Sequence, residues 1–402
     1  MIFAFVSVHS VHALSFPSGI SNYVALNISN SQSTATPNPF QQMINISSSD
    51  NGWTYINTNQ TTAFGQNVEF FYANGTIIPS WLENYTSTHA LWWVKVGSIA
   101  ANSKLTIYMG FANKTTNLFN NKTTGEAPQL SSTYAEYDDG ANVFTNYWNF
   151  AGTSLPSGWN VSGTDYSVNN GISISGSSPA TYIQTSNTYN PETQIVDIYS
   201  YVNGLDNSGD YFQGYAQSGA GEPQYLISDR GGGGTSYTLT NYNGTESAVD
   251  IAGGSTTSYQ VWSVWISTTE SYATLNYGTP ATLSTDFTAE TSAYILLFQT
   301  NSNTQYTKWV DVRAYPPNGV MPSVSFGSVQ STTITLYLNG VSDANTSITY
   351  GTQSNFTAVI SLSTDYVSLY VNGTKVVSLT QGKAIYLKTL ATRLLKEKEL
   401  QG

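Results

Sequence analysis

Short runs of alternating apolar and polar residues, separated by turns rich in Asn, Gly, Ser and Thr, dominate this chain. A period of two places apolar side chains on one face of an extended segment, which is typical of half-buried β-strands. The clearest runs predict strands at 23–28, 68–72, 90–96, 105–111, 194–202, 261–267, 293–300 and 307–314. Helical periodicity is found only near the C-terminus. The pattern therefore predicts an all-β protein of tandem antiparallel β-sandwiches with a short C-terminal helix.

Two stretches mark boundaries between domains. Residues 125–140 are polar and end in Tyr137-Asp138-Asp139-Gly140, and residues 315–330 are rich in proline and turn residues. The expected parts are a first sandwich over 14–135, a second over 136–328, a third module over 329–382 and a basic tail over 383–402. The third module is shorter than the roughly 100 residues of an immunoglobulin-type sandwich, so we expect it to be incomplete.

Both ends of the sequence differ from the strand-rich middle. The apolar run at the start ends in Val11-His12-Ala13, which resembles a signal-peptidase site. It predicts a signal peptide over 1–13, with an N-terminal β-strand as the alternative. The tail is basic and predicts a short helix, which we interpret as an unrelated replacement of the domain's end or as a membrane-surface helix. Its apolar face would consist of Ile385, Leu390, Leu394 and Leu395.

Charge and reactive side chains are scarce. Only 9% of residues are charged and the net charge is −11, against roughly 25% charged residues in ordinary soluble proteins. An acidic chain is a poor partner for nucleic acid, whose phosphates need a basic surface. The chain has no cysteine and, after Ala13, a single histidine, His89. Because histidine and cysteine supply most bases, nucleophiles and metal ligands, the composition favours binding over catalysis.

Several aromatic segments of the first domain carry a family resemblance. They are Ile78-Pro-Ser-Trp-Leu-Glu83, Leu91-Trp-Trp-Val-Lys-Val96, Ile99-Ala-Ala-Asn-Ser103, Leu105-Thr-Ile-Tyr-Met-Gly110 and then Tyr137-Asp138-Asp139. Residues 16–158 resemble a secreted, mostly archaeal and bacterial domain family of unknown function, numbered 2341. The resemblance implies a cell-surface setting and no established catalytic residues.

The second domain resembles the jelly-roll sandwich of legume lectins and glucanases, a concanavalin A-like fold. The segment from Phe150 to Trp159 is similar to the opening of that superfamily, and Trp309–Tyr315 is similar to its closing strand. The module from 329 is similar to part of a bacterial immunoglobulin-like repeat. These resemblances imply three consecutive β-domains and an extracellular role.

The jelly-roll resemblance also implies a structural calcium site. Relatives hold Ca²⁺ between the opening segment and an aspartate of the last strand, which correspond here to Asn149 and Asp311. Oxygen ligands are those that Ca²⁺ requires. The alternative is that Asp311 pairs with Arg313 on the same face of its strand. No other cofactor is predicted.

Two strands have the composition of a sugar-binding face. Aromatic rings stack on the C–H faces of a pyranose, and amide or carboxylate groups bind its hydroxyls. The loop Asp229-Arg-Gly-Gly-Gly-Gly234 could close over such a face. The alternative is that tyrosine is simply a good strand former. The candidate residues are Asp197, Tyr199 and Tyr201 on one strand and Tyr211, Gln213, Tyr215 and Gln217 on another.

Catalytic residues are not predicted. The Glu-x-Asp-x-x-Glu strand signature of glucanases is absent, and Glu192 and Asp197 point to opposite faces because they lie five residues apart. Glu83, Glu136, Glu222 and Asp229 have no acidic neighbour in sequence, although folding could join them. His89 stands at a strand entrance, where a surface or hydrogen-bonding role is expected.

Asn-x-Ser/Thr sequons are concentrated in the first domain. These are acceptors for N-glycosylation if the chain is exported to a glycosylating surface. The predicted sites are Asn27, Asn45, Asn59, Asn74, Asn84, Asn113 and Asn121.

Together these features predict an exported cell-surface protein that is non-catalytic and serves adhesion or recognition of glycans or other surface polymers. One alternative is a structural subunit of a surface layer or filament that self-associates through strand edges. A second is a polysaccharide-degrading hydrolase or lyase that uses paired carboxylates. No transmembrane anchor is predicted in this chain, because no stretch reaches roughly 20 apolar residues.

Overall fold

The computed structural model confirms the all-β class. It describes residues 14–59, 64–176, 181–205, 211–229, 236–300 and 303–331, together with the strands at 4–9, 334–338, 341–342, 354–360, 366–371, 374–380 and 385–389. Helical structure in these ranges is limited to α1 (Gly140–Val143) and the 3-10 turns η1 (Trp53–Tyr55) and η2 (Pro317–Gly319). All eight strands predicted from alternation are present, with ends that differ by a few residues.

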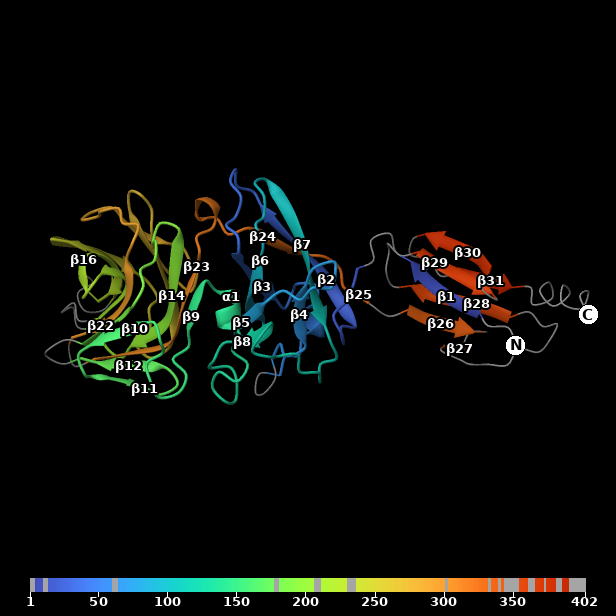
Figure 1. The fold of residues 1–402 in the computed structure, drawn as a ribbon, viewed down its shortest axis with the longest axis horizontal. Helices are drawn as coiled ribbons and strands as arrows, with labels where there is room; N and C mark the ends of the chain where they lie inside the picture. The colour runs from blue at the N-terminus through green and yellow to red at the C-terminus, as the bar shows by residue number, and fades with distance from the viewer. Residues whose placement is uncertain are drawn as a thin grey trace, which may run out of the picture.

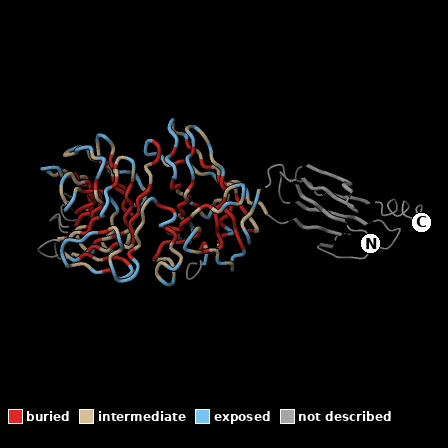
Figure 2. Tube along the Cα trace, in the orientation of Figure 1, coloured by how far each residue is buried: buried red, intermediate tan, exposed pale blue. Residues whose placement is uncertain are grey.

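The first sandwich consists of two sheets that enclose a core of aliphatic and aromatic side chains (Figures 1 and 2). One sheet has the order β24 (Ser323–Phe326), β2 (Asn22–Asn30), β7 (Ser103–Phe111), β4 (Val68–Phe71), with β25 (Gln330–Ser331) also on β2. The other has the order β3 (Phe40–Ser47), β6 (His89–Val96), β5 (Ser80–Tyr85), β8 (Thr124–Glu126). Alternation on β2 buries Val24, Leu26 and Ile28, so this core is the one that the sequence pattern predicts.

Strands β24 and β25 complete the first sandwich from the far end of the second. Phe326 lies opposite Leu26, and Gln330 lies opposite Tyr23. Residues 323–331 therefore belong to the first sandwich, whereas the sequence pattern predicts that this stretch is divided between the second and third parts. The physical reason is that β2 would otherwise present a row of unpaired backbone groups along its edge.

The second sandwich is a pair of larger antiparallel sheets. Its seven-stranded sheet has the order β10 (Trp159–Ser162), β13 (Thr181–Thr185), β22 (Tyr294–Gln299), β15 (Tyr211–Gln217), β16 (Gly221–Ser228), β17 (Tyr237–Asn243), β18 (Thr245–Ile251). Its eight-stranded sheet has the order β11 (Tyr166–Val168), β12 (Ile172–Ser175), β23 (Thr304–Ala314), β14 (Gln194–Val202), β19 (Gln260–Ile266), β20 (Ser271–Leu275), β21 (Ala281–Leu283), with β9 (Asn146–Trp148) also on β23. Figure 1 shows β9, β14 and β23 on the side that faces the first sandwich.

The remaining strands form two further sheets. One has the order β1 (Ala4–His9), β29 (Tyr366–Val371), β30 (Thr374–Thr380), and the other β27 (Val341–Ser342), β26 (Ile334–Leu338), β28 (Ser354–Ile360), β31 (Ile385–Thr389). The first includes residues of the expected signal peptide, as in the alternative of an N-terminal strand. The expected C-terminal helix is wrong for Ile385–Thr389, because this segment, with Ile385 and Leu387 two residues apart, is a strand that pairs with β28. Residues 390–402 lie outside the described ranges.

In the described part of the chain, no helix is both long and apolar enough to cross a bilayer.

Candidate functional site at the junction of the two sandwiches

The outer face of the eight-stranded sheet packs against the first sandwich through tryptophans. Trp309 of β23 meets Trp81 of β5 edge to face, with ring centroids 5.2 Å apart, and Phe144 packs on Trp81 in the same way at 5.2 Å. Trp81, Trp93 and Trp309 are fully buried. Such edge-to-face pairs contribute about 0.5–1.5 kcal/mol beyond the area they bury, so the junction is a packed interface.

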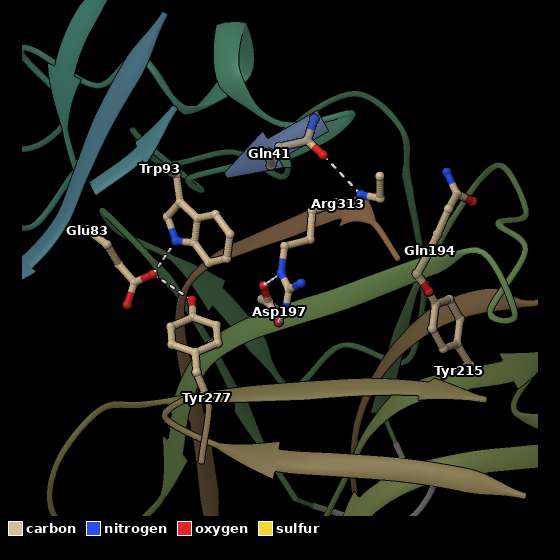
Figure 3. A network of polar contacts seen from close by, with 9 residues as sticks. Gln41, Glu83, Trp93, Gln194, Asp197, Tyr215, Tyr277 and Arg313 are labelled. Atoms are coloured by element: carbon tan, nitrogen blue, oxygen red, sulfur yellow. Dashed lines mark hydrogen bonds and ion pairs between the residues drawn. The ribbon is translucent and has the colours of Figure 1, made fainter. Parts of the chain in front are cut away.

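A buried ion pair lies at the centre of this junction (Figure 3). The Nε of Arg313 on β23 donates to Asp197 Oδ2 of β14 at 2.5 Å. The guanidinium also lies over the rings of Trp93 and Tyr277, at 5.0 and 5.7 Å from their centroids. Arg313 and Asp197 are diagonal neighbours on adjacent strands, because Asp197 stands directly opposite Asp311. The expected pairing of Arg313 with Asp311 is therefore replaced by a pairing across strands.

Glu83 brings a second carboxylate to the junction. It is the extra residue of a β-bulge, since β5 shifts register against β6 between Leu82 and Asn84, and bulges commonly re-aim a side chain. Glu83 Oε2 accepts from Trp93 Nε1 at 2.7 Å and from the Tyr277 hydroxyl at 2.5 Å (Figure 3). Burial nevertheless raises the pKa of Glu83 to about 7. The residue thus changes charge near neutral pH inside the interface.

Asp311 is a third buried carboxylate, and it has no hydrogen-bond partner in the described structure. Its exposed fraction is 0%, and neither carboxyl oxygen has a donor. Burial, followed by the charge of Asp197, holds the pKa of Asp311 well above its ordinary value, and Arg313 offsets this only in part.

Asp138 of the Tyr-Asp-Asp-Gly segment holds the connection between the sandwiches. Its carboxylate accepts from Trp81 Nε1 at 2.9 Å, the Tyr147 hydroxyl at 2.9 Å and Asn149 Nδ2 at 2.6 Å. The next glycine is sterically required, because a Cβ at Gly140 would lie 2.5 Å from the Tyr147 ring. This motif is thus a structural hub, a role that its sequence alone did not reveal.

The structure corrects the predicted sugar-binding face at four of its seven residues. Tyr211, Gln213 and Tyr215 have exposed fractions of 1, 0 and 0% and point into the second sandwich. There Gln213 accepts from Ser200 Oγ at 2.7 Å, and the Tyr215 hydroxyl donates to the Gln194 carbonyl at 3.2 Å (Figure 3). Asp197 is likewise buried, in its ion pair. These side chains cannot stack on a ligand without unpacking the core.

Two tyrosines of the predicted face, Tyr199 and Tyr201, are only half-buried and belong to a larger group of rings. Tyr201 stacks on Tyr306 of β23 at 4.9 Å and meets Tyr259 edge to face at 4.8 Å, and Tyr199 packs on Tyr259 at 5.2 Å. All four are half-buried. Lys308 lies over Tyr259 at 5.7 Å. We call Tyr199, Tyr201, Tyr259 and Tyr306 the tyrosine platform.

The outer face of the seven-stranded sheet is closed by its own hairpin. Phe212, Ala216, Leu226 and Leu296 form a small buried cluster there. The backbone N–H of Gly219, in the turn between β15 and β16, donates to Gln184 Oε1 of β13 at 2.8 Å. Because β22 lies between β13 and β15, the turn must cross over it. The centre of this face is therefore covered by protein.

The calcium prediction stays a prediction. Asn149 directs its Nδ2 to Asp138 and its Oδ1 accepts from the Ala151 N–H at 3.1 Å, so its amide is already engaged. Within the described ranges, no group of three or more histidine, aspartate or glutamate side chains is placed to hold a metal ion. Of the two predicted ligands, only Asp311 has carboxyl oxygens without a hydrogen-bond partner among the described residues.

The remaining predicted residues lie at the surface or outside the described ranges. His89 is exposed at the start of β6, where its Nδ1 is 2.9 Å from Thr88 Oγ1. Glu222 is exposed and accepts from the Gly244 N–H at 2.6 Å. The loop 230–235 is not described. Among the predicted glycosylation sites Asn27 is half-buried, and exposed positions are occupied by Asn45, Asn59, Asn74, Asn84, Asn113 and Asn121.

Comparison with protein families identifies the stretch around the Asp138 hub. Residues 64–162 match DUF2341, a domain of unknown function. This match confirms the predicted resemblance. It covers β4 to β10, and therefore the second half of the first sandwich, the connecting segment and the first strands of the second sandwich.

One curated relative shares the sequence over part of its length. It is "Uncharacterized protein 562" of Sulfolobus islandicus rod-shaped virus 1, 36% identical over 129 residues, which are 31% of this chain and 21% of that protein. The matched region thus spans about a fifth of the relative.

Solved structures with a similar shape cover a little under half of the chain. The apo Crh5 transglycosylase has a TM-score of 0.35 at 12% identity and covers 43% of this chain and 85% of its own. A Bacillus licheniformis β-glucanase has a TM-score of 0.33 at 13% identity, with 42 and 97% covered. A β-1,3-1,4-glucanase from a mouse hindgut metagenome has a TM-score of 0.33 at 13% identity, with 43 and 98% covered.

Proposed function

We propose that this protein is an exported, non-catalytic surface protein that recognises glycans or related surface polymers through the tyrosine platform. The observation that carries the proposal is the packing of Tyr199, Tyr201, Tyr259 and Tyr306 on the outer face of β14 and β23. Surface tyrosines that pack on each other are held rigid, so they lose little side-chain entropy when a ligand binds. Their rings suit the C–H faces of sugars, and their hydroxyls suit the polar rim.

The surroundings of the tyrosine platform supply further polar groups. Ser173 stands opposite Tyr306 on β12, and its Oγ lies 2.8 Å from that of Ser167, which is exposed. Lys308, the extra residue of a bulge in β23, donates to the Asn170 carbonyl at 2.7 Å and stays half-exposed. Hydroxyls and one cation beside an aromatic row are suited to a neutral or weakly acidic polymer.

An exported setting is supported by the sequons and by the low charge. Six of the seven predicted glycosylation asparagines of the first domain are exposed, so glycans there would not disturb the core. With 9% charged residues, the chain also has few carboxylates whose protonation in acid could destabilise the fold.

Removal of the tyrosine platform tests this function. The Tyr201→Ala/Tyr306→Ala variant of the full chain should bind a polysaccharide that the wild type recognises at least about tenfold more weakly. This corresponds to a loss of about 1.4 kcal/mol in binding free energy. The control is Tyr242→Ala, which removes a half-buried tyrosine from β17 of the other sheet. A glycan array identifies the polysaccharide, and circular dichroism checks the fold.

Three results would contradict the proposal. Unchanged binding in the double variant would place recognition elsewhere on the molecule. If the folded wild type binds no glycan on the array and assembles into ordered structures in solution, a structural subunit would be favoured. Release of shortened sugar products would instead indicate a hydrolase or lyase.

A further inference from the structure

We propose that a pocket between the two sandwiches, separate from the tyrosine platform, binds a single neutral sugar ring. This inference rests on the proposed glycan recognition and adds a second, smaller site to it. The pocket has a volume of about 190 Å³. Met43 and Trp93 of the first sandwich line one side, and Trp265, Thr274 and Tyr277 of the second line the other.

The walls offer a mostly apolar surface with two polar groups, the Thr274 hydroxyl and the Trp265 Nε1–H, that are buried without a hydrogen-bond partner among the described residues. Thr274 is 4% exposed, and its hydroxyl has no hydrogen-bond partner in the described structure. A buried hydroxyl without a partner costs free energy, which a ligand hydroxyl in the pocket would recover. Aromatic walls with a few polar groups among them match a sugar ring, whose C–H faces are apolar and whose edge is polar.

The electrostatics of the pocket favour a neutral ligand. Arg313 also lines it, but the guanidinium is already paired with Asp197 and covered by two aromatic rings. An anion would have to compete with that ion pair and would approach Glu83 and Asp311. A cation would meet a guanidinium that is already there.

The size of the pocket restricts the ligand to one ring. At about 190 Å³ the pocket is smaller than the roughly 300–1,000 Å³ typical of sites for drug-sized ligands. A terminal residue of a polymer or a free monosaccharide fits this description, whereas an extended chain does not. Because both sandwiches contribute walls, a bound ring would also stabilise their junction.

Titration of the full chain with free monosaccharides tests the inference. Glucose, mannose, galactose and N-acetylglucosamine are added at millimolar concentrations, and tryptophan fluorescence and the melting temperature are recorded. Trp93 and Trp265 in the walls report occupancy. Sorbitol, an acyclic polyol, controls for general stabilisation by excluded solutes. At least one ring sugar should give a saturable response that sorbitol does not.

Two variants and a matched control locate the response. Thr274→Val removes the hydroxyl at nearly constant shape and should weaken the response about three- to tenfold, the effect of one neutral hydrogen bond. Met321→Trp fills the pocket from its rim and should abolish the response. Thr307→Val is the control, because Thr307 is also buried with an unpartnered hydroxyl but does not line the pocket. It should bind like the wild type.

The results separate this inference from the proposed function. No saturable response in the folded wild type, or a response that both pocket variants retain, overturns the pocket site even if the tyrosine platform binds a polysaccharide. A monosaccharide response that is lost in Tyr201→Ala/Tyr306→Ala but kept in Thr274→Val assigns the sugar to the tyrosine platform and also overturns it. A response lost only in the pocket variants supports the site, whatever the platform binds.

Discussion

Replacement of Arg313 by methionine is the most direct test of the junction. Methionine keeps much of the apolar stem but removes the guanidinium, so Asp197 loses its ion pair. Trp93 and Tyr277 lose the cation over their rings as well. Glu83 and Asp311 then face Asp197 with no positive charge among them.

The expected cost follows from burial. The ion pair is 2.5 Å long, and the side chains of Arg313 and Asp197 have exposed fractions of 6 and 0%. Removal of one member of a buried pair leaves an uncompensated charge and typically costs about 3–5 kcal/mol. The second sandwich should therefore lose about 3–5 kcal/mol of unfolding free energy, a large part of the 5–15 kcal/mol that a typical domain has.

Urea unfolding followed by tryptophan fluorescence measures this loss. Lys122→Met is the control, because it removes an exposed cation and should change the unfolding free energy by less than about 0.5 kcal/mol. The double variant Arg313→Met/Asp197→Leu should recover most of the loss, since it removes both charges. A loss below about 1 kcal/mol in Arg313→Met, with no change in the double variant, would refute the view that this pair is a buried and coupled element of the junction.

Three further predictions concern the same interface. The pKa of Glu83 is raised from 4.5 to about 7 in the folded protein. Protonated Glu83 therefore stabilises the fold fully below its unfolded pKa, and this stabilisation is lost as the pH rises through about 7. In Glu83→Gln, the decrease in unfolding free energy between about pH 4 and 8 should therefore be smaller than in the wild type by roughly 3 kcal/mol. An unaltered pH profile would contradict this role of Glu83. Asp138→Asn should destabilise the protein by about 2–4 kcal/mol, because the amide presents a donor to three donors, and a change within error would show that the hub is dispensable. If calcium binds at Asp311, EDTA should lower the melting temperature of the wild type but not of Asp311→Asn, and a melting curve insensitive to EDTA excludes the ion.

Strand positions were predictable because alternation is a local property. On β14 and β15 the pattern correctly groups Tyr199 with Tyr201 and Tyr211 with Tyr215, since a period of two fixes which side chains share a face. The period does not tell which of the two faces of a strand is buried when tyrosine-bearing faces occur on both strands. Here β15 turns its tyrosines into the core, whereas β14 turns its tyrosines outward.

The junction was not predictable from local patterns. Arg313 finds its partner 116 residues away on β14 rather than two residues away on its own strand. Glu83 and Tyr277 meet across 194 residues, and their contact exists only because the two sandwiches dock. Single acids spread along a sequence give no sign that folding will bring them together.

The sequence by itself determined the all-β class, the positions of the main strands and the scarcity of charge. It also determined the resemblance to the DUF2341 family over the first domain and the segment that follows it. Each of these depends on composition or on neighbours within a few residues. The tertiary structure alone decided which faces are buried, which strands complete the first sandwich, and how three acidic side chains and one arginine come together in a buried interface. Those outcomes depend on packing between distant segments, where burial and pairing are set by the sheet on the other side and not by the strand itself.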